Sequence, residues 1–372
     1  MGLIGCGNMA LNDHARTYLA HPERFRVVAA ADPTPERLAL GREMLGLLAV
    51  DVYADAAAVV ARPDVEVVDV CTPQHTRRDI VEAAAAAGKH VLCEKPLATV
   101  PADAAAMVAA TRAAGVLLGV VHNYYFFPEI AAALQLLRDG AIGQVEVAIL
   151  NYLGVIDLPG NAAYRPTWRH EAALAGGGVL MDMLHVVYVA EALLGRTIER
   201  VSGYVDARDP GAPVESLALC RFETERNAAL VNVGWGVGPG GIEVSGSAGR
   251  LALGYRDGAT SPFVPFEEMV LHDTVGRRRI SVPAGAPDPF TALALDFADA
   301  VVHGRDPIAP GEQGLHTLEA TLAVYESCAL GRTVTLPLDH GDPVYRLGVA
   351  GVNELELPDW SPVRRHRLFG AG

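Results

Sequence analysis

A glycine-rich turn stands near the start of the chain, in Gly5-Cys6-Gly7-Asn8-Met9-Ala10. The spacing GxGxxA falls between a short apolar run, which predicts a strand, and a stretch of helical composition. In such a turn the first glycine allows a tight bend, the second lets backbone approach a phosphate, and the small third residue allows close packing of helix on strand. The N–H groups at the helix start then favour an anion. A plain structural turn is the alternative interpretation of this pattern.

Asp32 narrows the predicted phosphate site to a dinucleotide site. It ends the apolar run 27–31, at about the 20-residue distance expected of an acid that binds a ribose 2′-OH. A carboxylate at that place repels a 2′-phosphate, so we predict NAD over NADP. Arg37 lies one helical turn further on and keeps NADP open. The alternative role for Asp32 is a helix N-cap before Pro33 and Pro35.

Polar residues also follow two further predicted strands, where ligands of parallel sheets bind. Thr72-Pro73-Gln74-His75 comes after the run 65–71, and Glu94-Lys95-Pro96 comes after 90–93. A lysine flanked by Glu and Pro is held by a stiff backbone, and its ammonium group can donate hydrogen bonds to a substrate hydroxyl. We therefore prefer a functional Lys95 to a solvated loop lysine.

Asp182 and His185 form the third candidate group. They lie within the apolar stretch 179–187, on a helix predicted from about Gly178 to Leu194, after Gly176-Gly177-Gly178. Residues three apart on a helix share a face, so the carboxylate and the imidazole can point together, His185 as proton acceptor and Asp182 as its orienter or as a ligand of a substrate hydroxyl. Hydrogen-bonded buried polar residues are the alternative.

The elements that must position these groups indicate two domains. Over residues 1–122, short β-branched runs alternate with Ala-rich stretches, the pattern of βαβ units and a parallel sheet. The predicted strands are 2–4, 25–31, 65–71, 90–93 and 116–121, and the predicted helices are 9–20, 35–45, 76–87 and 101–114. This is the expectation for a Rossmann NAD(P)-binding domain, of α/β class.

The second predicted domain, 123–340, groups longer strands together and has few helices, so we expect α+β character with an open, predominantly antiparallel sheet. Its predicted strands are 145–153, 198–206, 217–222, 228–235 and 242–245. Later helices, 291–303 and 314–328, are expected to return over the first domain or the sheet. Residues 341–372, opened by Gly341-Asp342-Pro343, are predicted to be an irregular tail.

Charge and composition exclude several classes of protein. The chain of 372 residues has a net charge of −14, which argues against a surface for nucleic acid or anionic membranes, because both partners need clustered Lys and Arg. The basic runs Arg277-Arg278-Arg279 and Arg364-Arg365 are too short to reverse that balance. Five scattered cysteines without a CxxC pair predict neither a disulfide framework nor a zinc site. Reduced thiols and the absence of a signal-like or membrane-spanning run predict a cytoplasmic protein. We expect no metal ion.

Taken together, these motifs resemble the glucose-fructose oxidoreductase and inositol dehydrogenase family, known as Gfo/Idh/MocA. The resemblance runs through GLIGCGNMA, ADPTPER, CTPQH, CEKPLA, GGGVLMDMLH and GEQGLHTLEATLAVYESCALGR. It implies a Rossmann domain followed by an open-sheet domain that often mediates dimers or tetramers, with a sugar or polyol as substrate. We therefore expect a homodimer or homotetramer.

The resemblance also implies roles for individual residues. Lys95 is similar to the lysine that contacts the reacting hydroxyl, Asp182 to the substrate-binding acid, and His185 to the proton-transferring histidine. The cofactor-contacting positions implied are Gly5, Gly7, Asn8, Met9, Asp32, Thr72, Pro73, Gln74, His75, Glu94 and Asn123.

Two departures from the family pattern bear on the substrate. Only Met183 and Leu184 separate Asp182 from His185, where the family usually has three residues, and one residue on a helix is about 100° of rotation. Gln74 and Arg77 stand where the family often has Asn and His.

We predict an NAD(P)-dependent oxidoreductase that oxidises or reduces a secondary alcohol or ketone of a sugar, polyol or sugar derivative. Substrate specificity is expected from a polar-aromatic stretch and the strand before it, with Tyr152, Tyr164, Trp168 and Arg169 as candidates. Two alternatives remain open at this point: redox-neutral glycoside cleavage through transient oxidation and elimination, and a non-catalytic regulator that senses cofactor or sugar.

Overall fold

The computed structural model describes residues 1–155, 168–207, 212–236, 238–254, 266–282 and 285–361. Backbone contacts divide the chain into two compact units. The first holds Met1–Asn123 together with Pro287–Leu315, and the second holds the described residues of 124–286 and 316–361. Pro287–Leu315, which the sequence-based boundary places in the second domain, therefore belongs to the first unit.

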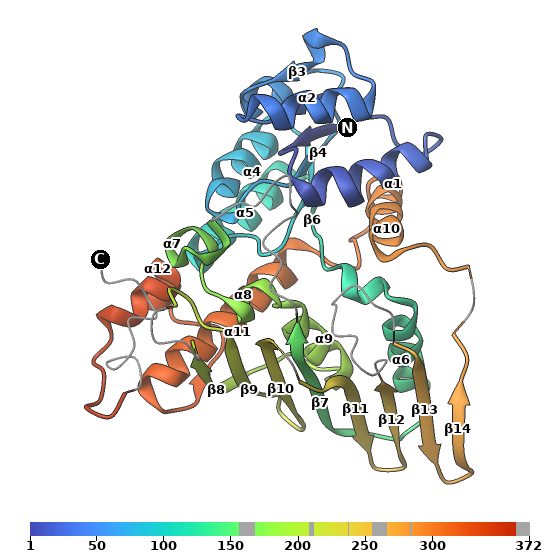
Figure 1. Cartoon of the computed structure of the whole chain (residues 1–372), viewed down its shortest axis with the longest axis vertical. Coiled ribbons are helices and arrows are strands. Elements are labelled where there is room, and N and C mark those ends of the chain that lie inside the picture. Colours follow the sequence, from blue (N-terminus) through green and yellow to red (C-terminus); the bar gives the residue numbers. More distant parts are fainter. Residues whose placement is uncertain (156–167, 208–211, 237, 255–265, 283–284, 362–372) are drawn as a thin grey trace. The chain divides into compact units, whose positions relative to one another are not determined.

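The first unit is built on a six-stranded parallel sheet in the order β3-β2-β1-β4-β5-β6 (Figure 1). The strands are short and, apart from the half-buried edge strand β3, mostly buried, as expected of apolar runs covered on both faces. Their bounds are β1 Gly2–Ile4, β2 Ala29–Ala31, β3 Val52–Tyr53, β4 Val67–Val70, β5 His90–Cys93 and β6 Leu118–Val120. The predicted strand 25–31 is thus confined to its last three residues. This strand order is that of the doubly wound dinucleotide-binding fold.

Helices of the first unit begin and end at the residues that favour such ends. Several carry Pro in the first turn, and α2 and α5 are closed by Gly46 and Gly115 in the left-handed conformation. The bounds are α1 Ala15–Ala20, α2 Pro35–Leu45, η2 Ala49–Asp51, α3 Ala56–Val60, η3 Gln74–Thr76, α4 Arg77–Ala86, α5 Pro101–Ala114 and α10 Pro289–His303. The Asp288 side chain caps α10 by accepting from the N–H groups of Phe290 and Thr291.

The first helix departs from the prediction. Where an uninterrupted helix over 9–20 is expected, the structure has a π-helical turn, η1 Ala10–His14, followed by α1. The Ala15 N–H donates to the carbonyl of Ala10, five residues back. One extra residue in the turn changes which side chains face the sheet, and such π turns are frequent at functional sites.

The second unit is built on a nine-stranded sheet in the order β14-β13-β12-β11-β7-β10-β9-β8-β15. All neighbours are antiparallel except β7 and β10, so the predominantly antiparallel sheet is confirmed. The bounds are β7 Val145–Val155, β8 Arg200–Asp206, β9 Leu217–Glu223, β10 Ala228–Trp235, β11 Gly240–Gly246, β12 Gly249–Gly254, β13 Glu268–Asp273, β14 Gly276–Ile280 and β15 Val334–Thr335. Figure 1 shows the strands from β8 through β7 to β14 side by side.

Helices pack on one face of this sheet. Buried α9 contacts β7 and β10, and Val324 of α11 lies against Gly203 of β8. The bounds are η4 Asn123–Phe126, α6 Pro128–Arg138, η5 Trp168–His170, α7 Ala172–Ala175, α8 Val179–Asp182, α9 His185–Leu194 and α11 Gly311–Leu330. The tail predicted as irregular instead contains α12 Pro343–Leu347, capped by Asp342, and η6 Gly348–Glu354. Buried Val344 and Val352 explain why this segment is ordered.

Within the described residues, no single helix is long and apolar enough to cross a membrane. The bent pair Ala172–Asp182 and His185–Leu194 meets that criterion only when both helices are taken together.

Candidate functional site

Backbone hydrogen bonds align the motif residues along one edge of the first sheet. The Gly5 N–H donates to Ala31, the Cys71 N–H to Ile4 and the Glu94 N–H to Val70. Each strand therefore ends at the same level. The glycine turn, the turn after Cys71 and Lys95 follow at the carboxyl edge, where parallel sheets bind ligands.

The glycine turn has the geometry that its sequence predicts. Gly5 has φ +92°, and a Cβ there would lie 2.9 Å from the carbonyl of Cys71, so only glycine fits. A Cβ on Gly7 would meet no atom within 4 Å. No packing within the described chain therefore requires glycine at position 7, and the open space beside it leaves room for a phosphate.

Asp32 holds this turn in place. Its Oδ2 accepts from the Cys6 N–H at 2.7 Å and its Oδ1 accepts from the Thr34 N–H at 2.8 Å. The cap of α2 is Thr34, so Asp32 is not the helix N-cap itself. The Nε of Arg37 donates to the Cys6 carbonyl at 2.8 Å, which ties this arginine to the same turn.

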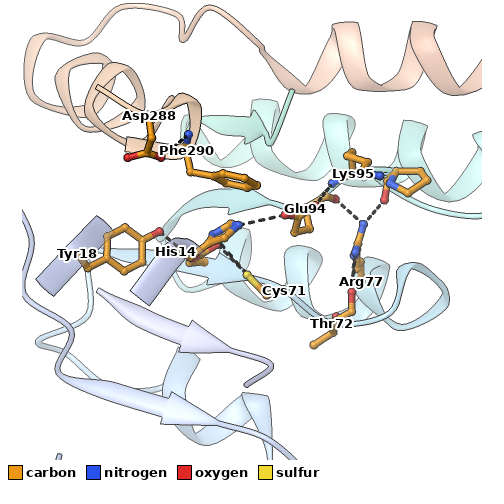
Figure 2. A network of polar contacts seen from close by, with 11 residues as sticks. His14, Tyr18, Cys71, Thr72, Arg77, Glu94, Lys95, Asp288 and Phe290 are labelled. Carbon is orange, nitrogen blue, oxygen red and sulfur yellow. Dashed lines mark hydrogen bonds and ion pairs between the residues drawn. The ribbon is translucent and has the colours of Figure 1, made fainter. Parts of the chain in front are cut away.

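Arg77 joins the two loops that follow β4 and β5, as Figure 2 shows. Its Nε and Nη2 donate to the carbonyl of Thr72 at 2.8 and 2.6 Å, and its Nη1 donates to the carbonyls of Glu94 and Pro96. The residue is buried. From the sequence, Arg77 is a departure from the family pattern that bears on the substrate. In the structure its guanidinium, which presents several donors in a fixed fork, binds backbone carbonyl groups and holds the two loops together.

Lys95 is half-buried at the carboxyl edge of the sheet. Its own N–H donates to Oε2 of Glu94 at 3.0 Å, and the Lys95-Pro96 peptide is cis. Only two of the chain's 30 basic residues are lysines, Lys89 and Lys95. Glu94 is predicted as a cofactor contact, whereas the structure gives both of its carboxylate oxygens donors from the protein.

The remaining predicted cofactor residues differ in accessibility. Asn8, Met9, Thr72 and Pro73 are half-buried and His75 is exposed, whereas Gln74 and Asn123 are buried. His122, at the end of β6, was not predicted. Burial and the nearby charge of Lys95 lower the pKa of His122 to about 3, so its ring is neutral.

A buried polar cluster, which no sequence motif indicates, surrounds His14. Nδ1 of His14 lies 2.9 Å from Asp69 and Nε2 lies 3.0 Å from Glu94. The Tyr18 hydroxyl donates to Asp69 at 2.7 Å, and the Cys71 sulfur lies 3.5 Å from both His14 and Asp69. One polar atom each of His14, Asp69 and Cys71 lies within 4.8 Å of the others. No motif reveals this cluster, because its members are far apart in the sequence.

In the second unit, the predicted continuous helix 178–194 is wrong. It is broken after Asp182, where Met183 and Leu184 separate α8 from α9, and the helical segments Ala172–Asp182 and His185–Leu194 meet at a bend of 43°. The shared-face argument for Asp182 and His185 therefore fails, because the two residues lie on different helices.

His185 begins α9 in a buried aromatic setting. Its ring stacks on that of Tyr124 with centroids 4.2 Å apart, and its Nδ1 lies 2.6 Å from the hydroxyl of Tyr188. The Tyr124 N–H donates to the same hydroxyl at 3.1 Å. These contacts fix the plane of the imidazole.

Of the other predicted substrate residues, Arg169 contacts Asp182 directly, and Trp168 contacts Arg169. Asp182 pairs with Arg169 at 2.8 Å, and both side chains are about one-third exposed. The guanidinium of Arg169 also lies over the ring of Trp168, 5.2 Å from its centroid. Tyr152 is buried in β7, and Tyr164 lies outside the described residues.

Glu215 braces the turn from which α8 starts. Its carboxylate accepts from the N–H groups of Gly178 and Leu180 at 2.8 to 3.0 Å, and the Tyr325 hydroxyl donates to it at 2.8 Å. A Cβ on Gly178 would lie 2.1 Å from the Glu215 carbonyl, and one on Gly177 would lie 2.3 Å from the Tyr325 hydroxyl. The triple glycine therefore serves this close approach.

Glu215→Ala should lower the free energy of unfolding by about 3 kcal/mol, taking about 1 kcal/mol for each donor left without an acceptor. Urea unfolding at pH 8 measures the loss, and Glu215→Gln should lose less.

Burial raises the pKa of Glu215 to about 7, above its usual 4.5. The protonated form of Glu215 therefore stabilises the folded state fully below pH 4.5, and this stabilisation is lost as pH rises through 7. The stability advantage of wild type over Glu215→Gln should therefore shrink over that range; a constant difference would contradict the assignment.

Comparison with known proteins identifies the family to which the chain belongs. Residues 1–122 match the model of an oxidoreductase family with an NAD-binding Rossmann fold, and residues 130–252 match that of the GFO/IDH/MocA C-terminal domain. The chain is 29% identical to D-apiose dehydrogenase of Paraburkholderia graminis over 90% of this chain and 88% of that protein. It is 31% identical to 1,5-anhydro-D-fructose reductase of Ensifer adhaerens over 75% of this chain and 82% of that protein.

Among solved structures, aldose-aldose oxidoreductase from Caulobacter crescentus, complexed with glycerol, is similar with a TM-score of 0.79 and 30% identity. The likeness covers 90% of this chain and 98% of that one. The chain therefore belongs to the Gfo/Idh/MocA family of oxidoreductases.

Proposed function

We propose that this protein is an NAD-dependent dehydrogenase or reductase that interconverts a secondary alcohol and a ketone in a sugar, polyol or sugar derivative. The observation that carries the proposal is the placement of Lys95. It follows β5 at the carboxyl edge of the same sheet as the glycine turn, and Glu94 and Arg77 hold its loop. Two relatives are named D-apiose dehydrogenase and 1,5-anhydro-D-fructose reductase, and these names support a sugar or sugar derivative as the substrate.

The residues of the first unit fit a dinucleotide. The open space beside Gly7 suits a pyrophosphate, and Asp32 places a carboxylate beside the turn, where it would accept from ribose hydroxyls. A 2′-phosphate would meet that negative charge, which favours NAD over NADP. When bound, NAD supplies the carbon that exchanges a hydride with the substrate.

The protein's own contribution is to hold the substrate oxygen and move its proton. Lys95 would donate a hydrogen bond to the reacting oxygen and stabilise the negative charge that develops there. His185 would exchange the hydroxyl proton at Nε2, because Nδ1 faces Tyr188. Asp182, oriented by Arg169, would accept from a neighbouring hydroxyl. Each role follows from the donors and acceptors that the side chain presents.

The test is a panel of sugars and polyols, including D-apiose, 1,5-anhydro-D-fructose and glycerol, assayed with NAD and NADP. We expect a change in the absorbance of reduced nicotinamide with at least one panel member, and a higher kcat/KM with NAD. Product analysis by mass spectrometry accompanies the assay. Turnover of a glycoside without net cofactor reduction would replace the proposal with redox-neutral cleavage, and no turnover of any panel member would count against it.

We further propose that the protein forms homo-oligomers through the outer face of the nine-stranded sheet. Tyr204 of β8, Leu219 of β9 and Leu230 of β10 are each 40 to 43% exposed on neighbouring strands. Tyr204 pairs directly with Leu219. Large apolar side chains gathered on one exposed face favour a second copy of the chain as partner.

Leu219→Asp should shift the protein toward the monomer, because it places a charge in the apolar patch of each copy. Light scattering coupled to size-exclusion chromatography measures the mass. Val275→Asp is the matched control, since Val275 is 87% exposed in the turn between β13 and β14. An unchanged mass in Leu219→Asp, or a monomeric wild type, would exclude this face as the interface.

A cytoplasmic location is also proposed. All five cysteines are unpaired, and four of them are buried. Thiols that are kept reduced are typical of that compartment.

A further inference from the structure

The His14 ring is held between two carboxylates in the interior of the first unit. Asp69 lies on one side, at Nδ1, and Glu94 on the other, at Nε2. All three residues are at least nine-tenths buried. Figure 2 shows the ring of His14 pointing toward Glu94, with Phe290 beside it. A neutral imidazole donates from one nitrogen only, so donation to both carboxylates requires the imidazolium form.

The charges around the ring support that form. Burial by itself lowers the pKa of His14, but the charge of Asp69 and its hydrogen bond, together with Cys71, raise it well above 6.5. Burial raises the pKa of Glu94, yet the hydrogen bond from His14 brings it below its usual value. The titratable and charged groups around His14 and its two carboxylates are Asp13, Tyr18, Asp69, Cys71, Arg77, Glu94 and Lys95. Asp288, at the start of α10, acts on Asp13.

Glu94 connects this cluster to Lys95. Its Oε1 accepts from His14, and its Oε2 accepts from the N–H of Lys95 at 3.0 Å. The carboxylate is therefore held at both ends. Arg77 fixes the same loop from the other side, through the carbonyl groups of Glu94 and Pro96. The backbone of Lys95 has no freedom to move without breaking one of these contacts.

The π turn is what brings His14 to this position. His14 is the last residue of η1, and 80 residues separate it from Glu94 in the sequence. Because a π turn holds one more residue than an α turn, it rotates the following side chains about the helix axis. Here the rotated side chain spans the ends of β4 and β5.

We propose that His14 is a positioning residue for Lys95, acting as a buried imidazolium that fixes Glu94 and, through Glu94, the backbone of Lys95. The inference rests on the role of Lys95 proposed above. It assigns to His14 a part in turnover rather than in cofactor binding, because the contacts reach Lys95 through Glu94.

Two substitutions separate this role from a general structural one. In His14→Gln the amide nitrogen reaches the place of Nε2 and keeps the contact to Glu94. In His14→Asn the amide nitrogen reaches only the place of Nδ1 and loses that contact. We expect kcat to fall by about 10- to 100-fold in His14→Asn, because a displaced reacting group is costly even at 1 Å, and by clearly less in His14→Gln. NAD affinity, measured by fluorescence titration, should change little in either.

The matched control is Thr17→Val. Thr17 is buried one helical turn from His14 and hydrogen-bonds Thr291 at 3.2 Å, with no contact to Glu94. It should lower the thermal unfolding temperature without lowering kcat. Equal losses of kcat in His14→Gln and His14→Asn, in proportion to their losses of thermal stability, would overturn the inference.

A spectroscopic test is independent of any substrate. In the full-length protein with 15N-labelled histidine, both ring nitrogens of His14 should carry protons from pH 6 to above pH 8, and the signal should vanish in His14→Asn. Titration of this ring near pH 6.5 would overturn the inference even if Lys95 proves catalytic. So would stoichiometric zinc in the purified protein that is lost in His14→Asn, because a metal ion on Nδ1 would replace the proton.

Thermal stability should follow the same titration. Because the folded-state pKa of His14 lies above its unfolded value of 6.5, its stabilising effect is fully present below pH 6.5 and is lost as pH rises through the folded-state pKa. The difference in unfolding temperature between wild type and His14→Asn should therefore be largest in mild acid and shrink in alkali. A difference that grows with pH would contradict the imidazolium.

Discussion

Replacing Lys95 with alanine should lower kcat/KM for the sugar substrate by about 10²- to 10³-fold, the usual effect of removing one donor to a developing oxyanion. Glu94 and Arg77 contact the backbone of the loop that follows β5 and carries Lys95. The loop should therefore keep its conformation in the variant. Initial rates of nicotinamide reduction give kcat/KM, and a separate NAD titration gives the affinity for the cofactor.

Lys89→Ala is the natural control for this experiment. Lys89 is the chain's second lysine, and it donates to the carbonyl of Arg62 at 2.9 Å, away from the strand ends that carry the motifs. Its loss should leave kcat unchanged. Lys95→Arg should not restore activity, because a planar guanidinium differs from an ammonium in size and geometry. Full activity in Lys95→Ala would remove this residue from the mechanism.

The second large effect is expected for His185→Asn, with kcat lowered by about 10²- to 10⁴-fold, the range typical of a lost general acid or base. Asparagine is close to the ring in size and can still reach the Tyr188 hydroxyl, but it cannot take up a proton at neutral pH. The limb of the pH–rate profile that reports the proton acceptor should disappear with it. Stopped-flow measurement of the first turnover separates this loss from slow product release.

Tyr188→Phe refines the same prediction. It removes the hydroxyl that lies 2.6 Å from Nδ1 while the stacking of Tyr124 on His185 remains. We expect a smaller loss of kcat and a shifted pH profile, since the partner of one ring nitrogen sets the state of the other. His303→Asn, on the exposed end of α10, is the control that should change neither kcat nor the pH profile. Equal activity in His185→Asn and wild type would refute the assignment of proton transfer to His185.

Much of the first unit could be predicted from local sequence. The helices α2, α4 and α5 and the strands β4 and β5 lie where Pro, Gly and β-branched residues indicate them. Lys95 could be placed at a strand end for the same reason. These features depend on the preferences of a few neighbouring residues, which the chain carries with it.

The break before His185 could not be predicted from such preferences. Hydropathy continues through Met183 and Leu184 without a Pro or Gly, so the pattern indicates one helix. Two partners outside the segment favour the break: Glu215 ties down the N–H groups at the start of α8, and Tyr124 stacks on His185 at the start of α9. Tyr188, within α9, also contacts the His185 ring. Tertiary contacts often override helix propensity in this way.

The sequence by itself determined the family, the parallel sheet with its glycine turn, and the residues whose types suit a nucleotide and a hydroxyl. The tertiary structure decided how those residues are held. The contacts of His14 with Glu94 and of Gly178 with Glu215 join residues 80 and 37 positions apart. Strand register and a π turn set these distances, and neither is encoded in a run of neighbouring residues. That is the physical reason why the motifs could be found in the sequence and their supports could not.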